Sequence, residues 1–313
     1  MIQIYVIMAN SLQKIFDLAL KQSKGGLPSE GYVTPEGNLY TAYCTNQKWD
    51  DFLEDMKSNH KDAYCEFSKG NGAELSGKKN RYGNTVPPKM ASYASSSRFI
   101  YELSKDIPGF AFECKLRTSF GVSKASLDGY IKSKCLYVEA KCHEIYSGLS
   151  SPYKRAYEPL YEYIKGKTDL DYIITTGRNK VNEYVRFKWN GEELKTLDFK
   201  QLLCHMLGIA NLALQEWDKC RKVSTLIYLV YNPDEILDLL TAERDRRDIL
   251  EKWENEKKEA QSVDFKQLYN HIVHYLSKNC PGICSNSSTV EDVAKVRCTK
   301  KVGRINTHQS SCN

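Results

Sequence analysis

The chain has 313 residues, of which 41% are hydrophobic and 27% charged. This ordinary globular composition excludes a collagen-like, mucin-like or wholly disordered chain. Lysine and arginine together number 45 against 39 aspartates and glutamates, a formal charge of +6 that is compatible with a polyanionic partner without requiring one. No apolar run reaches the length of about 18 residues expected of a membrane span, and the first residues lack the basic start of a signal peptide. We therefore expect a cytoplasmic protein with no membrane partner.

The first 90 residues are predicted to form a mainly helical region that packs on the core or precedes it. Residues 1–9 are apolar and fit either a short buried strand or the start of a helix, and 12–20 carry a helical stripe. A second helix is expected over 49–57. Residues 69–88 are rich in Gly, Ser, Asn and Lys, which is typical of a loop or a boundary.

A change of period marks the predicted core, which spans residues 91–278. A helix is expected over 92–105, ended by a Pro-Gly pair. The pattern then alternates with a period of two over 110–117, 125–131 and 135–142, which predicts three consecutive strands. Because the last two are separated by only three residues, we expect them to form a hairpin.

The remaining elements are predicted in the same way from periodicity and turn signals. We expect helices over 151–166, 198–213, 234–262 and 264–278, strands over 170–176, 183–189 and 223–231, and a turn at Asn190-Gly191. The last segment, 279–313, is a polar and basic tail that contains cysteines. The predicted order is therefore a helix, a three-strand meander, a helix and a strand, with insertions. This order indicates an α/β fold with a mixed central sheet flanked by helices.

The predicted hairpin carries the residues most suggestive of chemistry. Alternate residues of a strand share a face, so Glu139 and Lys141 point the same way, and the hairpin can bring Asp128 beside them. Two carboxylates that lie close together repel, and a divalent cation relieves that repulsion. Mg²⁺ prefers carboxylate oxygens and is usually held by one or two carboxylates with a phosphate. A metal so placed can polarise a phosphodiester, and a neighbouring lysine can stabilise the developing negative charge.

The Glu-x-Lys spacing alone has little weight, because the chain contains four such pairs. Glu113 and Lys115 are a genuine rival, since they also lie on a predicted strand. The combination with Asp128 and a tight turn favours Glu139 and Lys141. The plain alternative is a half-exposed hairpin that carries a glutamate and a lysine on its solvent side.

The arrangement Asp128-x10-Glu139-Ala140-Lys141 on adjacent strands after a helix resembles the PD-(D/E)XK nuclease superfamily, whose fold is restriction endonuclease-like. The wording SLDGYI…LYVEAKCHEIY is similar to that of bacterial restriction endonucleases. The resemblance is clear over residues 93–144 and looser to about 233. The proline that names the motif is absent, because Leu127 precedes Asp128.

The resemblance implies a role for each matching residue. Asp128 and Glu139 would be metal ligands for Mg²⁺ or Mn²⁺, with the carbonyl of Ala140 as a further ligand. Lys141 would be the catalytic lysine.

Two helices flanking the motif supply further candidates by the same resemblance. The helix before the core often provides an acidic residue, which here is Glu102, and the alternative is an ordinary exposed helix glutamate. A downstream helix often places a glutamine near the site, and Gln201 fits that position with His205 one turn later. Both could equally be polar edges of a core helix.

These observations lead to a hypothesis of metal-dependent hydrolysis of nucleic-acid phosphodiester bonds, with DNA the preferred substrate. Cleavage of two strands would favour a homodimer. The basic loop at Lys78, Lys79 and Arg81 would suit phosphate contacts and is equally suited to a solvated surface. The main alternative is a nuclease-like module that binds nucleic acid or a protein partner without cutting. A third is a structural or interaction protein whose hairpin carries these residues by chance.

Overall fold

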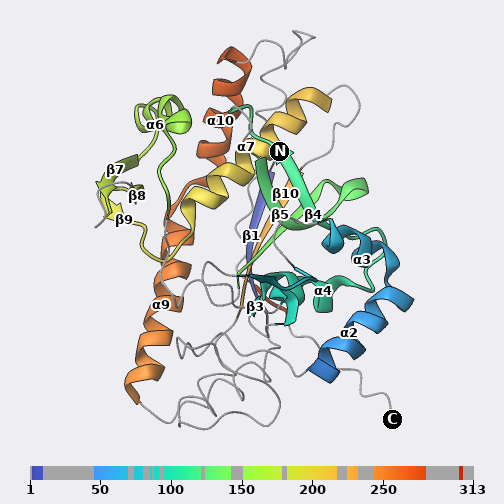
Figure 1. Ribbon diagram of the computed structural model, residues 1–313. Helices are drawn as coiled ribbons and strands as arrows, with labels where there is room; N and C mark the ends of the chain where they lie inside the picture. The colour runs from blue at the N-terminus through green and yellow to red at the C-terminus, as the bar shows by residue number, and fades with distance from the viewer. Residues whose placement is uncertain are drawn as a thin grey trace.

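The computed structural model describes residues 2–9, 46–69, 74–79, 85–86, 88–91, 95–120, 124–141, 151–177, 182–216, 224–231, 243–279 and 303–305. Its centre is a mixed sheet with the strand order β11-β1-β10-β6-β5-β4 (Figure 1). The strands are β1 (Ile2–Ala9), β4 (Ala111–Arg117), β5 (Lys124–Ile131), β6 (Leu136–Lys141), β10 (Ser224–Tyr231) and β11 (Gly303–Ile305). Strand β5 is antiparallel to both β4 and β6, whereas β10 is parallel to β6.

Helices cover both faces of this sheet. Helices α7 (Phe199–Glu216) and α10 (Phe265–Asn279) pack in one apolar layer with Leu127 and Tyr137 of the sheet. Helices α2 (Asn46–Asn59), α3 (Lys61–Ser68) and α4 (Ser96–Ser104) pack in the other layer with Val138 and Ala140. No helix within the described residues is both long and apolar enough to cross a membrane. A strand covered on both faces buries every side chain, and all of β6 after its first residue is buried.

The element order α4, β4, β5, β6, α7, β10 matches the order predicted from the sequence. The hairpin of β5 and β6 is also confirmed, with the short 3₁₀ turn η2 (Lys132–Lys134) between the strands. The α/β class with a mixed central sheet is therefore what the chain adopts. The smaller elements are the 3₁₀ turn η1 (Lys89–Ala91) and a two-stranded ladder of β2 (Lys78–Lys79) and β3 (Thr85–Val86).

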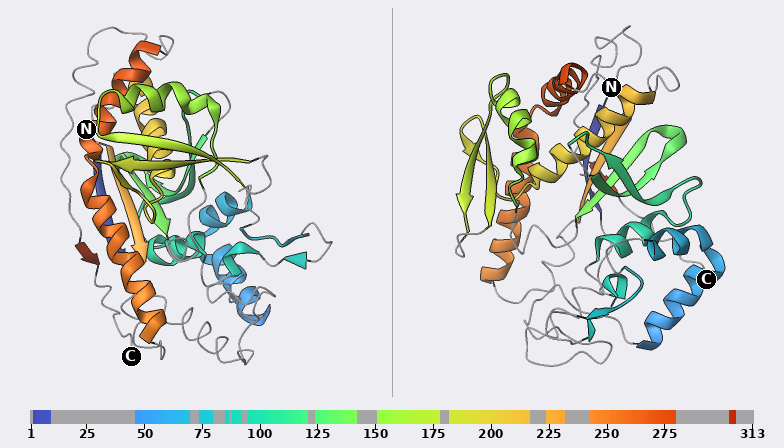
Figure 2. Two further views of the ribbon diagram at one scale, coloured as in Figure 1. Left: turned by 90° about the vertical axis from the view of Figure 1, so that its left-hand side faces the viewer. Right: turned by 45° about the horizontal axis from the view of Figure 1, so that its top comes forward.

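A three-stranded unit is inserted between β6 and α7. It contains the 3₁₀ turn η3 (Arg155–Tyr157), α6 (Glu158–Lys165), β7 (Leu170–Thr176), β8 (Glu183–Trp189) and β9 (Glu192–Glu193). The predicted turn at Asn190-Gly191 is confirmed: both residues have positive φ, 50° and 81°, as a two-residue hairpin turn of type I′ requires. The two ribbon views show this unit beyond α7 and α10 on the side away from the central sheet (Figure 2).

The apolar start of the chain forms β1, which pairs with β10 in the central sheet, so the strand alternative for residues 1–9 is confirmed. One predicted element differs from the structure: the expected helix over 151–166 is a regular α-helix only from residue 158. The long charged helix is α9 (Glu243–Ser262), and residues 234–242 of that prediction lie outside the described residues. The stripe over 12–20 and the tail, apart from β11, also lie outside them.

Two helices begin with the same string, Asp-Phe-Lys-Gln-Leu, and the aspartate caps each of them. The amide of Gln201 donates to the Asp198 carboxylate at 3.2 Å, and the amides of Lys266 and Gln267 donate to that of Asp264 at 3.1 and 3.0 Å. An aspartate at this position satisfies amides that have no partner inside the helix. The cap therefore fixes where α7 begins, and with it the height of the first turn above the sheet.

Strand β4 has an irregular backbone at Glu113, next to the predicted motif on β5. Glu113 has a positive φ of 57°, and its place in the ladder is opposite Asp128. Phe112 and Cys114 on either side of it pack into different layers, although residues two apart in a regular strand share a face. The positive φ thus reverses the alternation along β4, while the register with β5 stays the same on both sides of Glu113.

Candidate active site

The hairpin register gives Asp128 and Glu139 opposing positions just beyond its last pair. The last ladder pair toward the open end of the hairpin is Gly129 with Val138, so Asp128 and Glu139 are the next opposing residues. Here the backbone ladder stops, and the Oδ2 atom of Asp128 accepts a hydrogen bond of 2.7 Å from the amide of Ala140. The Asp128 carboxylate thus lies against the residue that follows Glu139, between the two strands.

Glu139 and Lys141 are buried and paired. Their exposed fractions are 3% and 5%, and the Lys141 Nζ atom lies 3.0 Å from the Glu139 Oε1 atom. The plain alternative of a glutamate and a lysine on the solvent side of the hairpin is therefore wrong. It fails because α7 covers the face that those side chains share. A buried charge is costly unless it is paired and hydrogen-bonded, which both of these are.

The first turn of α7 completes the cluster. The Gln201 side chain donates from Nε2 to the Glu139 Oε1 atom at 2.6 Å, and its own oxygen accepts a hydrogen bond from the Lys141 ammonium group. Asp198, the capping residue, lies 3.4 Å from the Lys141 Nζ atom through its Oδ2 atom. The Lys141 ammonium group is thus held by three oxygen acceptors from two elements. These contacts restrict the conformation of the Lys141 side chain.

His205 lies one turn further along α7 and is held as a neutral ring. Its Nε2 atom is 3.0 Å from the Ser126 carbonyl oxygen, which can only accept, so Nε2 carries the proton. Burial and the nearby Lys141 charge lower the pKa of His205 to about 3. The contact of 3.6 Å between Nε2 and the Glu139 Oε2 atom is therefore not an ion pair at neutral pH. Within the described residues the Nδ1 atom is buried with no hydrogen-bond partner.

Two other predicted or rival residues lie elsewhere. Glu102 is 44% exposed and pairs with Lys105 at 2.9 Å on α4, which covers the opposite face of the sheet, so the structure does not bring it to the cluster. Glu113 lies at the irregular position of β4. Burial, and next the charge of Glu74, raise the pKa of the Glu113 carboxyl, and Lys115 beyond it is exposed.

Metal binding at the hairpin would use oxygen ligands only. Asp128 and Glu139 offer carboxylates and Ala140 a main-chain carbonyl, which are the hard donors that Mg²⁺ prefers. No group of three or more His, Cys, Asp or Glu side chains suited to a metal ion occurs within the part of the chain that the structure describes. Two carboxylates are nevertheless enough for Mg²⁺ that keeps several waters or binds a substrate phosphate. The residues present fit such an ion by donor chemistry.

The cluster adjoins an open pocket of about 280 Å³. Asp198, Gln201 and His205 line it together with Lys124 and Lys154. Gln201 therefore lies between this pocket and the buried pair of Glu139 and Lys141. Any substrate that reaches Glu139 from this side first contacts the first turn of α7.

Asp198 is the residue of this cluster that sequence reasoning missed. The sequence Asp-Phe-Lys-Gln allows the prediction that Asp198 caps the helix, three residues before Gln201. A capping position does not predict the second contact, which Asp198 makes with Lys141. His143 and Glu144, which follow the motif, lie outside the described residues, as does Arg81 of the basic loop; Lys78 and Lys79 form β2.

No protein-family model matches the chain, and neither the curated proteins nor the solved structures contain a match.

Proposed function

We propose that the protein is a metal-dependent nuclease of the restriction endonuclease-like class, which hydrolyses phosphodiester bonds of nucleic acid and prefers DNA. The observation that carries this proposal is that Gln201 contacts both Glu139 and Lys141, while Asp128 accepts a hydrogen bond from the amide of Ala140 between them. Asp128 comes from β5, Glu139 and Lys141 from β6, and Gln201 from α7, which is 60 positions from Lys141 in the chain. A chance hairpin gives no reason for a distant glutamine to bridge the glutamate and the lysine.

The residues have separable roles in this reaction. Asp128, Glu139 and the Ala140 carbonyl would hold Mg²⁺ or Mn²⁺, which when bound supplies Lewis-acid polarisation of the phosphoryl group and a more acidic water. Lys141 stabilises the negative charge that grows on the phosphoryl oxygens. Gln201 keeps Lys141 beside Glu139. A water oxygen bonds to phosphorus, the ester bond to the leaving oxygen breaks, and that oxygen ends protonated.

Burial of the pair favours one alternative, a nuclease-like module that binds without cutting. With exposed fractions of 3% and 5%, Glu139 and Lys141 meet substrate only if Gln201 shifts from between them and the pocket. A module that had no need of cleavage would tolerate this closure. The experiment must therefore measure binding and cutting separately.

The test is cleavage of supercoiled plasmid and linear DNA in Mg²⁺, Mn²⁺ or EDTA, with Glu139→Gln and Lys141→Met beside the parent protein. We expect metal-dependent nicking that falls at least about a hundredfold in both variants, the size of loss seen when a charge-stabilising group is removed. Lys115→Met is the matched control, because this exposed lysine belongs to the rival Glu-x-Lys pair on β4, and it should cut normally.

Each other outcome points away from the proposal in its own way. Nicking that persists in Glu139→Gln would assign the activity to another site or to a contaminant. DNA retained in a gel shift without any cleavage would favour the binding module. Neither cleavage nor retention would leave the third hypothesis, a structural or interaction protein.

A further inference from the structure

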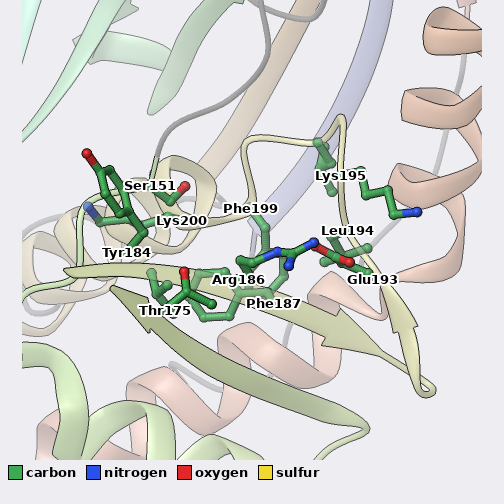
Figure 3. A pocket seen from close by; sticks show the side chains of 12 residues that line it. Ser151, Thr175, Tyr184, Arg186, Phe187, Glu193, Leu194, Lys195, Phe199 and Lys200 are labelled. Carbon is green, nitrogen blue, oxygen red and sulfur yellow. The ribbon is translucent and has the colours of Figure 1, made fainter. Parts of the chain in front are cut away.

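Two pockets meet where the inserted unit approaches the start of α7. The larger, of about 580 Å³, lies along β8 and the segment that leads into α7 (Figure 3). The smaller, of about 280 Å³, adjoins the candidate active site. Both are lined by Ser151 and Lys200, so the two pockets are neighbours. We call the pair of pockets the lysine groove, after Lys124, Lys154 and Lys200.

The lysine groove is basic where it adjoins the active site. Its smaller pocket is lined by three lysines and by one carboxylate, that of Asp198. Neither Lys124 nor Lys154 forms a salt bridge within the described ranges, and both are exposed. In the larger pocket the Arg186 guanidinium is already paired with Glu193, and Figure 3 shows these two side chains meeting. Exposed Lys195 also lines the larger pocket, so positive charge borders both pockets, and Lys124 and Lys154 supply it beside Gln201.

Lys200 is the residue that connects the two pockets. Its ammonium group donates to the carbonyl of Pro152, and Figure 3 shows it at the end of the larger pocket near Ser151 and Tyr184. Burial lowers the pKa of Lys200, and the positive charge of Lys154 lowers it further. Two cations that repel each other across a pocket are stabilised by an anion between them.

An anion in the smaller pocket would lie next to the cluster. Gln201 and His205 line this pocket, and the same two side chains contact Glu139. A chain of phosphates that entered along β8 would pass Lys200 and reach Gln201. A phosphodiester backbone has both the negative charge and the length for such a path, whereas a single free phosphate would occupy only one end.

We propose that the lysine groove binds the phosphodiester backbone of one strand of the nucleic-acid substrate, with Lys124, Lys154 and Lys200 contacting its phosphates. The inserted unit of residues 151–197 is then the element that guides the strand to the cluster. This inference rests on the proposed nuclease function for its substrate class, but the binding it describes can be measured without cleavage.

The experiment measures binding of a labelled DNA single strand and of its duplex by fluorescence anisotropy, in EDTA and over a series of salt concentrations. The groove variant is Lys124→Ala/Lys154→Ala. The matched control is Lys132→Ala/Lys134→Ala, which removes the same charge from exposed lysines in the turn at the other end of the β5–β6 hairpin. All four lysines are exposed, so both variants should fold, and thermal unfolding checks this.

We expect the groove variant to bind DNA at least about tenfold more weakly than the control variant at low salt. Because each phosphate contact contributes about 0.7–0.9 to the slope of log affinity against log salt, the slope should also fall by roughly 1.5. Equal weakening in the two variants would overturn the inference, since it would show only a loss of net charge. Absence of DNA binding by the parent protein would overturn it as well.

The failure of this inference and that of the nuclease proposal are distinguishable. Cleavage that depends on Glu139, with unchanged affinity in the groove variant, would reject the lysine groove and keep the nuclease. Affinity lost in the groove variant, with no cleavage by the parent protein, would keep the groove and reject the nuclease.

Discussion

Lys141 is a charged residue in a buried cluster. Its Nζ atom lies 3.0 Å from the Glu139 carboxylate and 3.4 Å from that of Asp198. Each partner supports the burial of the others, and removing one member of such a buried pair costs about 3–5 kcal/mol. Glu139 and Lys141 therefore contribute to folding as well as to the proposed chemistry. Substitutions at the cluster consequently need a stability measurement beside each activity measurement.

His205 should make stability depend on pH in a defined direction. Its pKa is depressed to about 3 in the folded protein, against 6.5 for an ordinary histidine. Below pH 6.5 His205 is protonated in the unfolded chain but stays neutral in the folded protein. The free energy of unfolding therefore falls as the pH drops from about 6.5 toward 3. The slope is about 1.4 kcal/mol per pH unit once the unfolded histidine is protonated.

The measurement is urea unfolding of the parent protein and of His205→Gln between pH 6.5 and 4.5, in EDTA so that no divalent ion binds. The variant should lose stability less steeply with falling pH, because glutamine does not titrate. Parallel curves for the two proteins would contradict a neutral buried ring. Carboxylates that titrate at the lower end affect both proteins and cancel in the difference.

Among single residues, the sequence predicted best those whose place follows from the alternation of side chains along a strand. Alternation placed Glu139 and Lys141 on one face, and the short turn placed Asp128 opposite Glu139. Gln201 came from the resemblance, since nothing local to it shows a contact 60 positions away. The structure does not bring Glu102 to the cluster, because its helix covers the other face of the sheet, and a sequence does not reveal which face a helix covers.

The approach of helix α7 to the sheet depends on Gly208. A Cβ atom there would lie 2.7 Å from the Cβ atom of Leu116 and 3.1 Å from that of Ala125, and both of these atoms are fixed to strands. Only glycine lets the helix come this close. Because α7 carries Asp198 and Gln201 at its start, the spacing at Gly208 also sets the height of the first turn over Glu139.

Gly208→Ala should destabilise the protein by about 1–3 kcal/mol through overpacking, despite the better helix propensity of alanine. Gly166→Ala is the control, because its φ is −74° and its nearest neighbour would be 3.6 Å away. We expect that change to be neutral or to stabilise by up to about 1 kcal/mol. Chemical unfolding of both variants tests the pair, and a Gly208→Ala protein as stable as the parent would contradict close packing.

Among helices and strands, the segments with clear alternation of apolar residues were predicted with the right bounds. The spans 170–176 and 183–189 coincide with β7 and β8, because alternating apolar residues bounded by turn signals leave little ambiguity. The start of the chain was ambiguous, since a short apolar run suits either a buried strand or a helix. Its pairing with β10 decides for a strand, and that partner lies more than 200 residues away.

Glu259 ties the inserted unit to the rest of the molecule. From α9 its carboxylate accepts hydrogen bonds from the amides of Lys195, Thr196 and Leu197, at 2.9, 2.9 and 2.7 Å. These amides precede α7, so the contact anchors the segment between β9 and that helix. The Glu259 carboxylate thereby holds in place residues 195–197, which lead from the three-stranded sheet of the inserted unit to α7 on the central sheet.

Loss of the Glu259 carboxylate should lower the free energy of unfolding of the whole protein. Glu259→Ala leaves three amides without their acceptor, and a loss of about 2–3 kcal/mol in the free energy of unfolding is expected from hydrogen bonds to a charged group. Glu254→Ala on the same helix is the control, since its contact with Lys257 is a loose surface pair of 3.9 Å worth less than about 1 kcal/mol. Equal losses measured by urea unfolding would reject the anchoring role.

The insertion between β6 and α7 has a consequence for the order of events during folding. The β5–β6 hairpin is local and can form within microseconds. The contact between Lys141 and Asp198 closes a loop of 57 positions that contains a second sheet, so it comes later. Newly made chains would pass through a stage in which Glu139 and Lys141 are already paired in a hairpin but still open to water. The site would acquire its buried electrostatics only when α7 docks, in the last steps of maturation.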